Sequence, residues 1–329
     1  KQQQDNKKIM TFLSSSLLPY LLATPALLAL ACKLYVSLTT VYTDENAVDM
    51  SNKVVIVTGC NTGIGLYTAR SLAKSRAHVI MAVRSMDKGE RAKREIELDC
   101  WNSKGFAPKI TVLPLDLSQL SSVRSFVALF RQLNLPLHVL INNAGVASEA
   151  SEAKDAENAE KENDQVSDLL EPMFATNHLG HYLLTKELLS LLKQSGTVED
   201  PSRVVIVASE AHRMVSHDLS VENLERYTKL PMVKSSAIAS VSALKQYGFT
   251  KLCNVYHAQH LAESLKQEGT NNVVVLSLHP GAIRSDLNRS VFEMPLLSRM
   301  VMVPLLMLAQ FMFFKSTKAG AQTSIFAAT

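Results

Sequence analysis

The sequence has few cysteines and only a small net charge. The four cysteines, Cys32, Cys60, Cys100 and Cys253, are scattered, with no CxxC pair and no spacing typical of metal ligands. We therefore expect ordinary thiols in a reducing compartment and no metal site. The formal net charge is only +4, and no block of Lys and Arg is interleaved with aromatic residues. Nucleic acid is therefore not an expected partner.

A long uncharged stretch stands near the start of the sequence. Residues 9–32 carry no charge and are flanked by lysines on both sides, and their length is sufficient to cross a bilayer core. Pro19 and Pro25 would kink a helix there, so a hairpin in one leaflet or in a lipid-droplet monolayer is the alternative. A signal peptide is disfavoured because no clear cleavage site precedes Lys33. We expect residues 1–45 to form a membrane anchor and a link.

Apolar runs alternate with helix-like segments through the rest of the chain. The runs lie at 53–59, 78–83, 109–115, 137–142, 203–209 and 272–278. The helix-like segments lie at 64–75, 87–99, 120–133, 178–193 and 251–266. This alternation indicates βαβ units and a parallel sheet covered on both faces. The predicted fold is α/β, a doubly wound parallel sheet of the Rossmann type, in one catalytic domain over residues 46–329.

Three segments interrupt this alternation. Residues 147–168 are acidic and of low complexity, which predicts a solvated insert. Residues 210–246 form a long connection, which in a compact domain is usually functional or disordered. Residues 291–314 are strongly apolar and are predicted to form an interfacial helix or a lid over a binding cleft.

A glycine-rich turn follows the first predicted strand. Residues 58–65 read TGCNTGIG, and glycine allows backbone to approach a phosphate closely. The N-terminus of the next helix would present free N–H groups to a pyrophosphate. A tight turn without a ligand is the alternative, but the strand–turn–helix context favours a nucleotide site. The predicted cofactor residues here are Gly59, Asn61, Thr62, Gly63, Ile64 and Gly65.

The end of the second predicted strand indicates which dinucleotide binds. An acidic residue there usually holds the ribose hydroxyls of NAD, whereas this chain has Arg84 and Ser85. Arginine matches a 2′-phosphate in charge and in geometry. NADP(H) is therefore preferred over NAD(H), and a solvated arginine is the alternative.

Tyr247 and Lys251 are four residues apart, which places them on one face of a helix. A lysine ammonium beside a tyrosine favours the phenolate and lowers its pKa from about 10. The pair is therefore a candidate for proton transfer, and a surface helix that happens to carry both residues is the alternative.

Several unlinked motifs together resemble the short-chain dehydrogenases/reductases over about residues 50–329. They are TGCNTGIG at 58–65, NNAG at 142–145, Ser209 after the fifth apolar run, and YGFTK at 247–251. The stretches NHLGHYLLT, SEAHR and HPGAIRSDL resemble the branch that contains the retinol dehydrogenases and the WW-domain-containing oxidoreductase, although no WW domain is visible. The family's last strand is missing after Thr329, so we expect a truncated chain.

The resemblance implies a role for each matching residue. Tyr247 would be the general acid/base, Lys251 would lower its pKa and hold the nicotinamide ribose, and Ser209 would bind the substrate oxygen. Asn177 would hold a water that links Lys251 to solvent. Further cofactor contacts are implied for Asp116, Leu117, Asn143, Ala144, Gly145, Pro280, Gly281 and Ile283. Capping roles for Ser209 and Asp116, and a satisfied polar role for Asn177, are the alternatives. No chemistry is assigned to His178, His181, His212 or His257.

The sequence therefore predicts a membrane-associated, NADP(H)-dependent oxidoreductase that interconverts a lipophilic alcohol and its carbonyl. Retinol and retinal are the first candidates by resemblance, and a sterol or a fatty aldehyde is an alternative. A dinucleotide-binding scaffold without turnover is a further alternative, which the intact Ser209, Tyr247 and Lys251 set disfavours. We expect the endoplasmic reticulum or a lipid droplet, with the catalytic domain facing the cytosol. The sequence does not decide whether the chain forms a homodimer.

Overall fold

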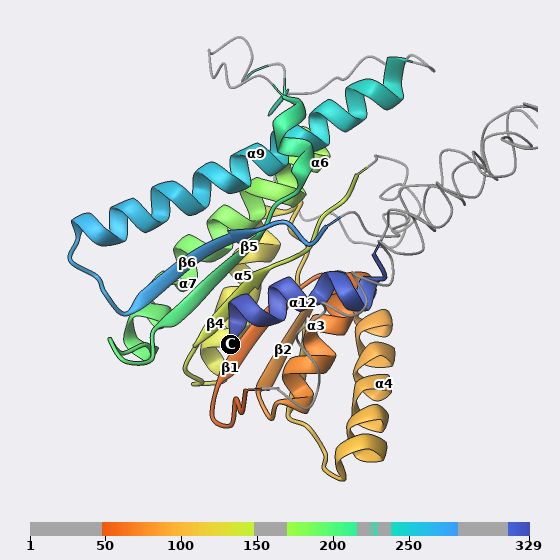
Figure 1. The fold of residues 1–329 in the computed structure, drawn as a ribbon, viewed down its shortest axis with the longest axis vertical. Coiled ribbons are helices and arrows are strands. Elements are labelled where there is room, and N and C mark those ends of the chain that lie inside the picture. Colours follow the sequence, from red (N-terminus) through yellow and green to blue (C-terminus); the bar gives the residue numbers. More distant parts are fainter. Residues whose placement is uncertain (1–47, 148–169, 216–224, 226, 229–237, 282–314) are drawn as a thin grey trace, which may run out of the picture.

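Six parallel strands form the centre of the molecule (Figure 1). The computed structural model describes residues 48–147, 170–215, 225, 227–228, 238–281 and 315–329. The predicted anchor, residues 148–168 of the acidic insert, the predicted lid at 291–314 and Ile283 lie outside the described residues.

The strand order is β3-β2-β1-β4-β5-β6, and every adjacent pair is parallel. The strands are β1 (Val54–Thr58), β2 (His78–Val83), β3 (Ile110–Pro114), β4 (Val139–Asn142), β5 (Ser202–Val207) and β6 (Val273–Leu278). They lie where the apolar runs predicted them, and the order reverses between β1 and β4. This is the doubly wound arrangement that the alternation predicted.

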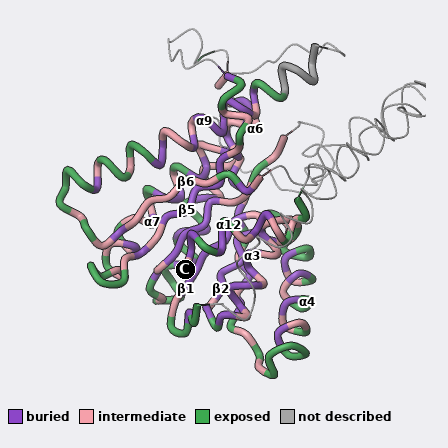
Figure 2. The backbone as a smooth tube through the Cα atoms, in the orientation of Figure 1, coloured by how far each residue is buried: buried purple, intermediate pink, exposed green. Residues whose placement is uncertain are grey.

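Helices cover both faces of the sheet, as Figure 1 shows. One face is covered by α3 (Gly63–Lys74), α4 (Met86–Lys104) and α12 (Thr317–Ala328). The other face is covered by α5 (Leu120–Gln132), α7 (Gly180–Ser195) and α9 (Ile238–Gln267). Since successive side chains of a strand point to opposite faces, Val55 and Val57 pack with the first set, and Val54 and Ile56 with the second. Burial on both faces explains why the strands are apolar throughout (Figure 2).

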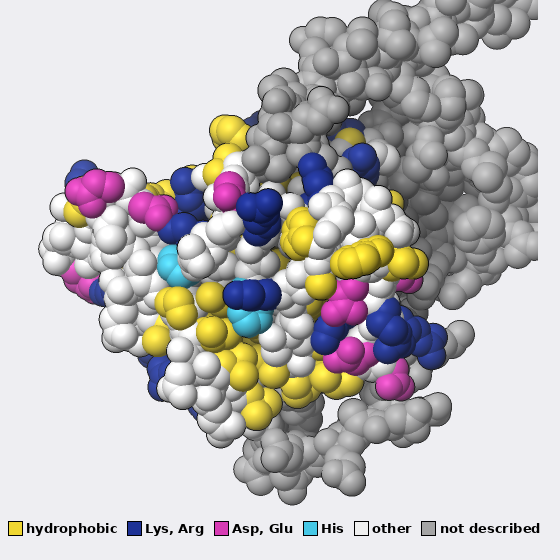
Figure 3. Space-filling view, turned by 90° about the horizontal axis from the view of Figure 1, so that it is seen from below, with side chains coloured by type: hydrophobic (Ala, Val, Ile, Leu, Met, Phe, Trp, Pro, Cys, Tyr) yellow, Lys and Arg dark blue, Asp and Glu magenta, His cyan; other side chains and the backbone are white. Residues whose placement is uncertain are grey.

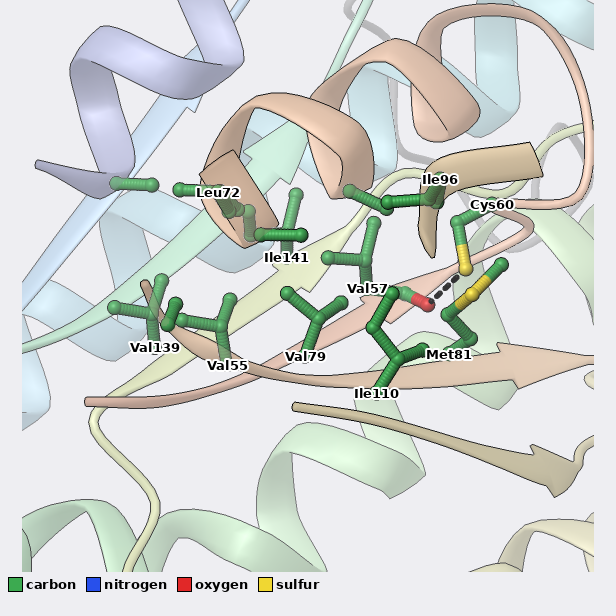
Figure 4. Packing of buried hydrophobic residues seen from close by; sticks show 14 of the residues in the cluster. Val55, Val57, Cys60, Leu72, Val79, Met81, Ile96, Ile110, Val139 and Ile141 are labelled. Atoms are coloured by element: carbon green, nitrogen blue, oxygen red, sulfur yellow. Dashed lines mark hydrogen bonds between the residues drawn. The ribbon is translucent and has the colours of Figure 1, made fainter. Parts of the chain in front are cut away.

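The apolar layer beneath the glycine turn is drawn in Figure 4. Val57, Met81 and Ile96 are fully buried there, and each such side chain contributes about 1.5–3 kcal/mol by leaving water. Cys60 lies at the edge of this layer, where its thiol donates to the carbonyl of Val57 at 3.1 Å. Burial raises the pKa of Cys60 to about 12, so this thiol stays protonated and serves packing.

The segment before α7 differs from the single helix predicted at 178–193. A short helix, α6 (Pro172–Phe174), leads into a π-helical turn, η5 (Ala175–Leu179), and α7 follows it. The buried carboxylate of Glu171 caps α6 by accepting the backbone N–H groups of Met173 and Phe174 at 3.1 and 2.7 Å. π-turns occur frequently at functional sites, and this one carries Asn177.

The predicted long connection at 210–246 is shorter than expected. Its start is a 3-10 helix, η6 (Glu210–Met214), and its end from residue 238 onward already belongs to α9. The prediction of a helix beginning at residue 251 was therefore wrong at that boundary. Because α9 begins earlier, Tyr247 and Lys251 lie within a regular helix and not at its first turn.

No helix among the described residues is long and apolar enough to cross a membrane.

On the face drawn in Figure 3, basic and acidic side chains lie close together at both ends.

Candidate active site

The candidate site lies at the carboxyl edge of the sheet. All strands are parallel, so the turns that follow β1, β2, β3, β4, β5 and β6 meet at this edge. In folds of this kind the ligand crevice lies where the strand order reverses, which here is between β1 and β4. Every predicted site residue that the structure describes belongs to one of these turns, to the first turn of α3, or to η5 and α9 beside them.

The glycine turn has the shape that a dinucleotide phosphate requires. Gly59 has φ +62°, and a Cβ on it would lie 2.8 Å from the Cβ of Ala144. A Cβ on Gly65 would lie 2.5 Å from the carbonyl oxygen of Gly59. Thr62 begins α3 without a side-chain cap, so the first N–H groups of that helix remain available to a ligand. The residues present therefore fit the pyrophosphate of a nicotinamide dinucleotide.

Asn143 fixes the glycine turn against β4. Its amide nitrogen donates to the carbonyl oxygens of Thr58 at 2.8 Å and Gly59 at 3.4 Å. The Thr58 hydroxyl in turn accepts the backbone N–H groups of Asn143 at 2.9 Å and Ala144 at 3.0 Å. The predicted pair of motifs at 58–65 and 142–145 thus forms one hydrogen-bonded unit.

The turns after β2 and β3 hold the residues predicted to contact the adenosine part. Arg84 is exposed directly after β2, and Ser85 caps α4 by accepting the N–H of Lys88 at 3.5 Å. Asp116 accepts the N–H of Ser118 at 2.9 Å and its hydroxyl at 2.6 Å. These bonds lie within the turn, and α5 begins after Gln119 without a side-chain cap, so the alternative of a helix cap is not found. The role of Asp116 toward adenine stays a prediction, as does that of the buried Leu117.

Asn177 is buried inside η5, and both polar atoms of its side chain form hydrogen bonds. Its Oδ1 accepts the N–H of Val146 at 2.8 Å, and its Nδ2 donates to the carbonyl of Val146 at 2.9 Å. Nδ2 also donates to the Thr250 hydroxyl at 3.1 Å, and Thr250 donates to the carbonyl of Tyr247 at 2.8 Å. Asn177 therefore ties the segment after β4 to the helical turn that carries Tyr247.

A polar contact with the Ser209 side chain lowers the pKa of Tyr247. Burial acts more strongly in the opposite direction, so the pKa of Tyr247 is raised overall. Ser209 also caps η6, because its hydroxyl accepts the N–H of Ala211 at 3.3 Å. The predicted lowering of the Tyr247 pKa by Lys251 is therefore not found. Desolvation of the phenolate dominates, and the chain's own groups keep Tyr247 protonated at neutral pH.

Lys251 is buried, with 3% of its surface exposed. Its Nζ donates to the carbonyl of Val207 at 3.0 Å and lies 5.5 Å from the centre of the Tyr247 ring. A Cβ on Gly145 would lie 3.3 Å from this Nζ, so the ammonium borders the crevice. Burial lowers the pKa of Lys251 to about 8, and the amine is still mainly charged at neutral pH.

The turn after β6 lies next to the Ser209 turn. The backbone N–H of Glu210 donates to Nδ1 of His279 at 3.3 Å. Pro280 is buried, and Gly281 has φ +91° beside the side chain of Lys315. Pro280 and Gly281 thus border the crevice from the β6 side, whereas Ile283 lies outside the described residues.

Sequence reasoning missed several residues that join these parts. Thr58 looked like the last residue of a strand, and Thr250 and Asn254 looked like polar positions on a helix. His181 was expected to be an ordinary polar or interface residue, but it is fully buried against Thr58 and Asn177. Within the described part of the chain, no cluster of His, Cys, Asp and Glu could hold a metal ion.

Comparison with known proteins agrees with this fold. Residues 53–221 match the family described as short chain dehydrogenase, and the chain belongs to that family of oxidoreductases, which bind a nicotinamide dinucleotide. Retinol dehydrogenase 12 of Mus musculus is 38% identical over 281 residues, covering 84% of this chain and 73% of that protein. The WW domain-containing oxidoreductase of Danio rerio is 35% identical, covering 85% of this chain and 59% of that protein.

Solved structures of the family have the same fold. An uncharacterised protein from Mycobacterium paratuberculosis has a TM-score of 0.58 and 28% identity, covering 88% of this chain and 80% of that chain. RhlG of Pseudomonas aeruginosa, solved as an NADP active-site complex, has a TM-score of 0.58 and 20% identity, covering 85% and 91%. The predicted family, branch and fold are confirmed.

Proposed function

We propose that this chain is a membrane-associated, NADP(H)-dependent oxidoreductase that interconverts a lipophilic alcohol and its carbonyl, with a retinol/retinal-like pair as the first candidate. The observation that carries the proposal is the convergence of Ser209, Tyr247, Lys251 and Asn177 beside the glycine turn. The 38% identity to a retinol dehydrogenase supports the substrate class.

Ser209 and Tyr247 would act on the substrate oxygen. When bound, the nicotinamide dinucleotide supplies or accepts the hydride at the carbonyl carbon. Negative charge then develops on the oxygen, where a hydroxyl donor such as Ser209 stabilises it and Tyr247 delivers a proton. Because burial raises the pKa of Tyr247, the phenol carries its proton at neutral pH. This protonation state is the one that a proton donor to the developing alkoxide requires, and the reducing cytosolic NADPH pool favours carbonyl reduction as the working direction.

Lys251 and Asn177 would support that proton transfer. An ammonium near the phenol ring stabilises the phenolate that remains once the proton has left. Lys251 lies 5.5 Å from that ring and borders Gly145, where it would also reach the nicotinamide ribose. Asn177 holds the Tyr247 turn through Thr250, so it would keep the phenol in place.

The preference for NADP(H) rests on Arg84. This side chain is exposed at the end of β2, where a guanidinium would pair with a 2′-phosphate. The apolar residues 9–32 and 291–314 support a lipophilic substrate and a membrane surface, which we place at the endoplasmic reticulum or a lipid droplet with the catalytic domain facing the cytosol. A homodimer is part of the same proposal.

The proposal is tested by NADPH consumption with the full chain in detergent. All-trans-retinal and a panel of apolar carbonyls serve as substrates, and NADH replaces NADPH in a parallel series. We expect turnover with NADPH that falls about 10³-fold in Tyr247→Phe, the scale of a lost general acid. Tyr256→Phe on the same helix is the matched control and should retain activity. Tight NADPH binding without turnover on any carbonyl would reject the proposal.

A further inference from the structure

His181, the second residue of α7, contacts both parts of the site at once. Only 1% of its surface is exposed. Its Nε2 lies 2.9 Å from the Thr58 hydroxyl, which holds the turn after β4. Its Nδ1 lies 3.1 Å from the backbone carbonyl oxygen of Asn177. One ring therefore spans from the last residue of β1 to η5.

The contacts of His181 determine which ring nitrogen carries the proton. A carbonyl oxygen can only accept, so Nδ1 must donate its hydrogen to Asn177, and Nε2 must then accept. The Thr58 hydroxyl already accepts two backbone N–H groups, from Asn143 and Ala144. Its single hydrogen is therefore free for Nε2 at 2.9 Å, while the alternative acceptor, the carbonyl of Ile141, is farther away at 3.4 Å. Every donor and acceptor is matched in this one arrangement.

The surroundings keep this ring neutral. Burial lowers the pKa of His181 to about 3, and the nearby charge of Lys251 acts in the same direction. His178 on η5 and His257 on α9 add to this lowering, and the bond to the Asn177 carbonyl opposes it only in part. A neutral ring is what the double contact requires, since an imidazolium would present a donor to Thr58.

We propose that His181 is a positioning residue that couples the dinucleotide crevice to Asn177. Through Nε2 it orients the Thr58 hydroxyl so that this oxygen can hold the N–H groups of Asn143 and Ala144. Through Nδ1 it fixes the Asn177 carbonyl, which also accepts Nδ2 of Asn254 at 3.1 Å. The kinetic part of this inference rests on the proposed function.

Two substitutions separate the two contacts of His181. An asparagine amide can take the place of Nδ1 and reach Asn177, but it is too short for Thr58. A glutamine amide can take the place of Nε2 and reach Thr58 instead. We expect His181→Asn to weaken NADPH binding about tenfold at nearly unchanged kcat, and His181→Gln to lower kcat about tenfold at nearly unchanged binding, since one lost hydrogen bond changes an equilibrium by roughly that factor. His181→Leu should lose both.

The experiment measures NADPH binding by calorimetry, kcat with the carbonyl panel, and thermal unfolding for each variant of the full chain. His138→Leu is the matched control, because it removes the ring nitrogen that accepts the backbone N–H of Val54 at 3.0 Å just before β4, at the opposite edge of the sheet from the crevice. It should lower the melting temperature without changing binding or kcat. If the His181 variants lose binding and kcat together, in proportion to their melting temperatures, His181 is only structural and the proposal is wrong.

A second measurement does not depend on turnover. Nitrogen NMR of histidine-labelled protein without nucleotide should show His181 as a neutral ring with its proton on Nδ1 at pH 6. A proton on Nε2, or a charged ring, would contradict the proposal. If the unsubstituted chain turns over no carbonyl, the proposed function fails, while the NMR and the NADPH binding still decide the role of His181.

Discussion

The two halves of the domain bury different kinds of polar side chain. In the nucleotide half, residues 48–117, the buried polar side chains are small hydroxyls, namely Thr58, Thr68, Ser71 and Ser75. In the catalytic half, the described residues of 138–281, they include a carboxylate, amides, imidazoles and an ammonium, namely Asn142, Glu171, Asn177, His181, Gln246, Lys251, Asn254 and His257.

This difference fits the proposed function of each half. A phosphate is bound by backbone N–H groups, so the nucleotide half requires a backbone shape and little buried polarity. Proton transfer requires side chains with perturbed pKa values, which only burial and charged or hydrogen-bonded neighbours supply. The catalytic half therefore contains groups that cost folding free energy, and the apolar sheet beneath it offsets that cost.

The sharpest test of this comparison is Lys251→Met. We expect kcat to fall about 10³-fold, on the scale of a lost proton-transfer partner, while the protein becomes more stable. A pKa of about 8 in place of 10.5 means that charging Lys251 in the folded state costs about 3 kcal/mol at pH 7. The unfolded chain keeps this proton up to pH 10.5 and the folded chain loses it near 8, so the cost shrinks as the pH rises between these values.

Chemical denaturation of both proteins from pH 7 to 10.5 measures this effect. The stability advantage of Lys251→Met should be constant below pH 8 and decline above it. Loss of stability at pH 7 would show that Lys251 stabilises the fold, and the comparison of the halves would then be wrong.

The second test compares two glycines that share a backbone conformation. Gly59 and Gly105 have φ +62° and +71°, but a Cβ on Gly59 meets Ala144 at 2.8 Å, while Gly105 faces open space. Each alanine should cost about 1–2 kcal/mol of stability for the left-handed backbone. Only Gly59→Ala should also weaken NADPH binding, by about 100-fold or roughly 2.7 kcal/mol, because the clash displaces the turn. Calorimetry with NADPH on both variants separates the effect of the clash on the shape of the glycine turn from the effect of backbone strain. Equal affinities of the two variants would contradict a role for the shape of the turn.

The third test compares a buried helix cap with an exposed one. Glu171 accepts two backbone N–H groups and the amide of Gln246 at 2.6 Å, so Glu171→Gln turns an acceptor into a donor among donors. We expect a loss of about 2 kcal/mol, the cost of an unmatched buried polar group. Ser316→Ala, which removes the exposed cap of α12, should cost about 1 kcal/mol or less. Urea denaturation measures both, and equal losses would show that burial does not raise the cost.

The smallest expected effect concerns the cofactor preference. Arg84→Ala should weaken NADPH binding about tenfold and leave NADH binding unchanged, since a charged hydrogen bond to a phosphate contributes about 1.5–3 kcal/mol. Arg91→Ala, on the exposed side of α4, is the control and should change neither. Binding of both nucleotides to both variants decides the point, and an equal loss for NADPH and NADH would assign Arg84 a different role.

The sheet and the glycine turn could be predicted because their signals are local. β-branched runs mark β1 and β5, and glycines mark the turn after β1. The early start of α9 could not be predicted, because residues 234–246 lack a clear apolar period. Nor could His181, because a lone histidine on a helix does not reveal which groups its ring will meet.

The pKa of Tyr247 shows the same limit at a predicted residue. The four-residue spacing correctly placed Lys251 near the ring, but the direction of the shift depends on desolvation. Desolvation is a property of the assembled fold, and no spacing in the sequence encodes it.

The π-turn η5 also affects how residues are counted along this segment. A π-turn holds one more residue than an α-helical turn of similar rise, so Ala175–Leu179 amounts to a one-residue insertion. Deleting a residue there would let the turn relax to α-helical bonding while α7 stays packed on the sheet. Since each α-helical residue turns by about 100°, the residues before the deletion would rotate around the axis, and Asn177 would face away from Val146 and Thr250. The length of this short turn is therefore under the same constraint as the identity of its asparagine.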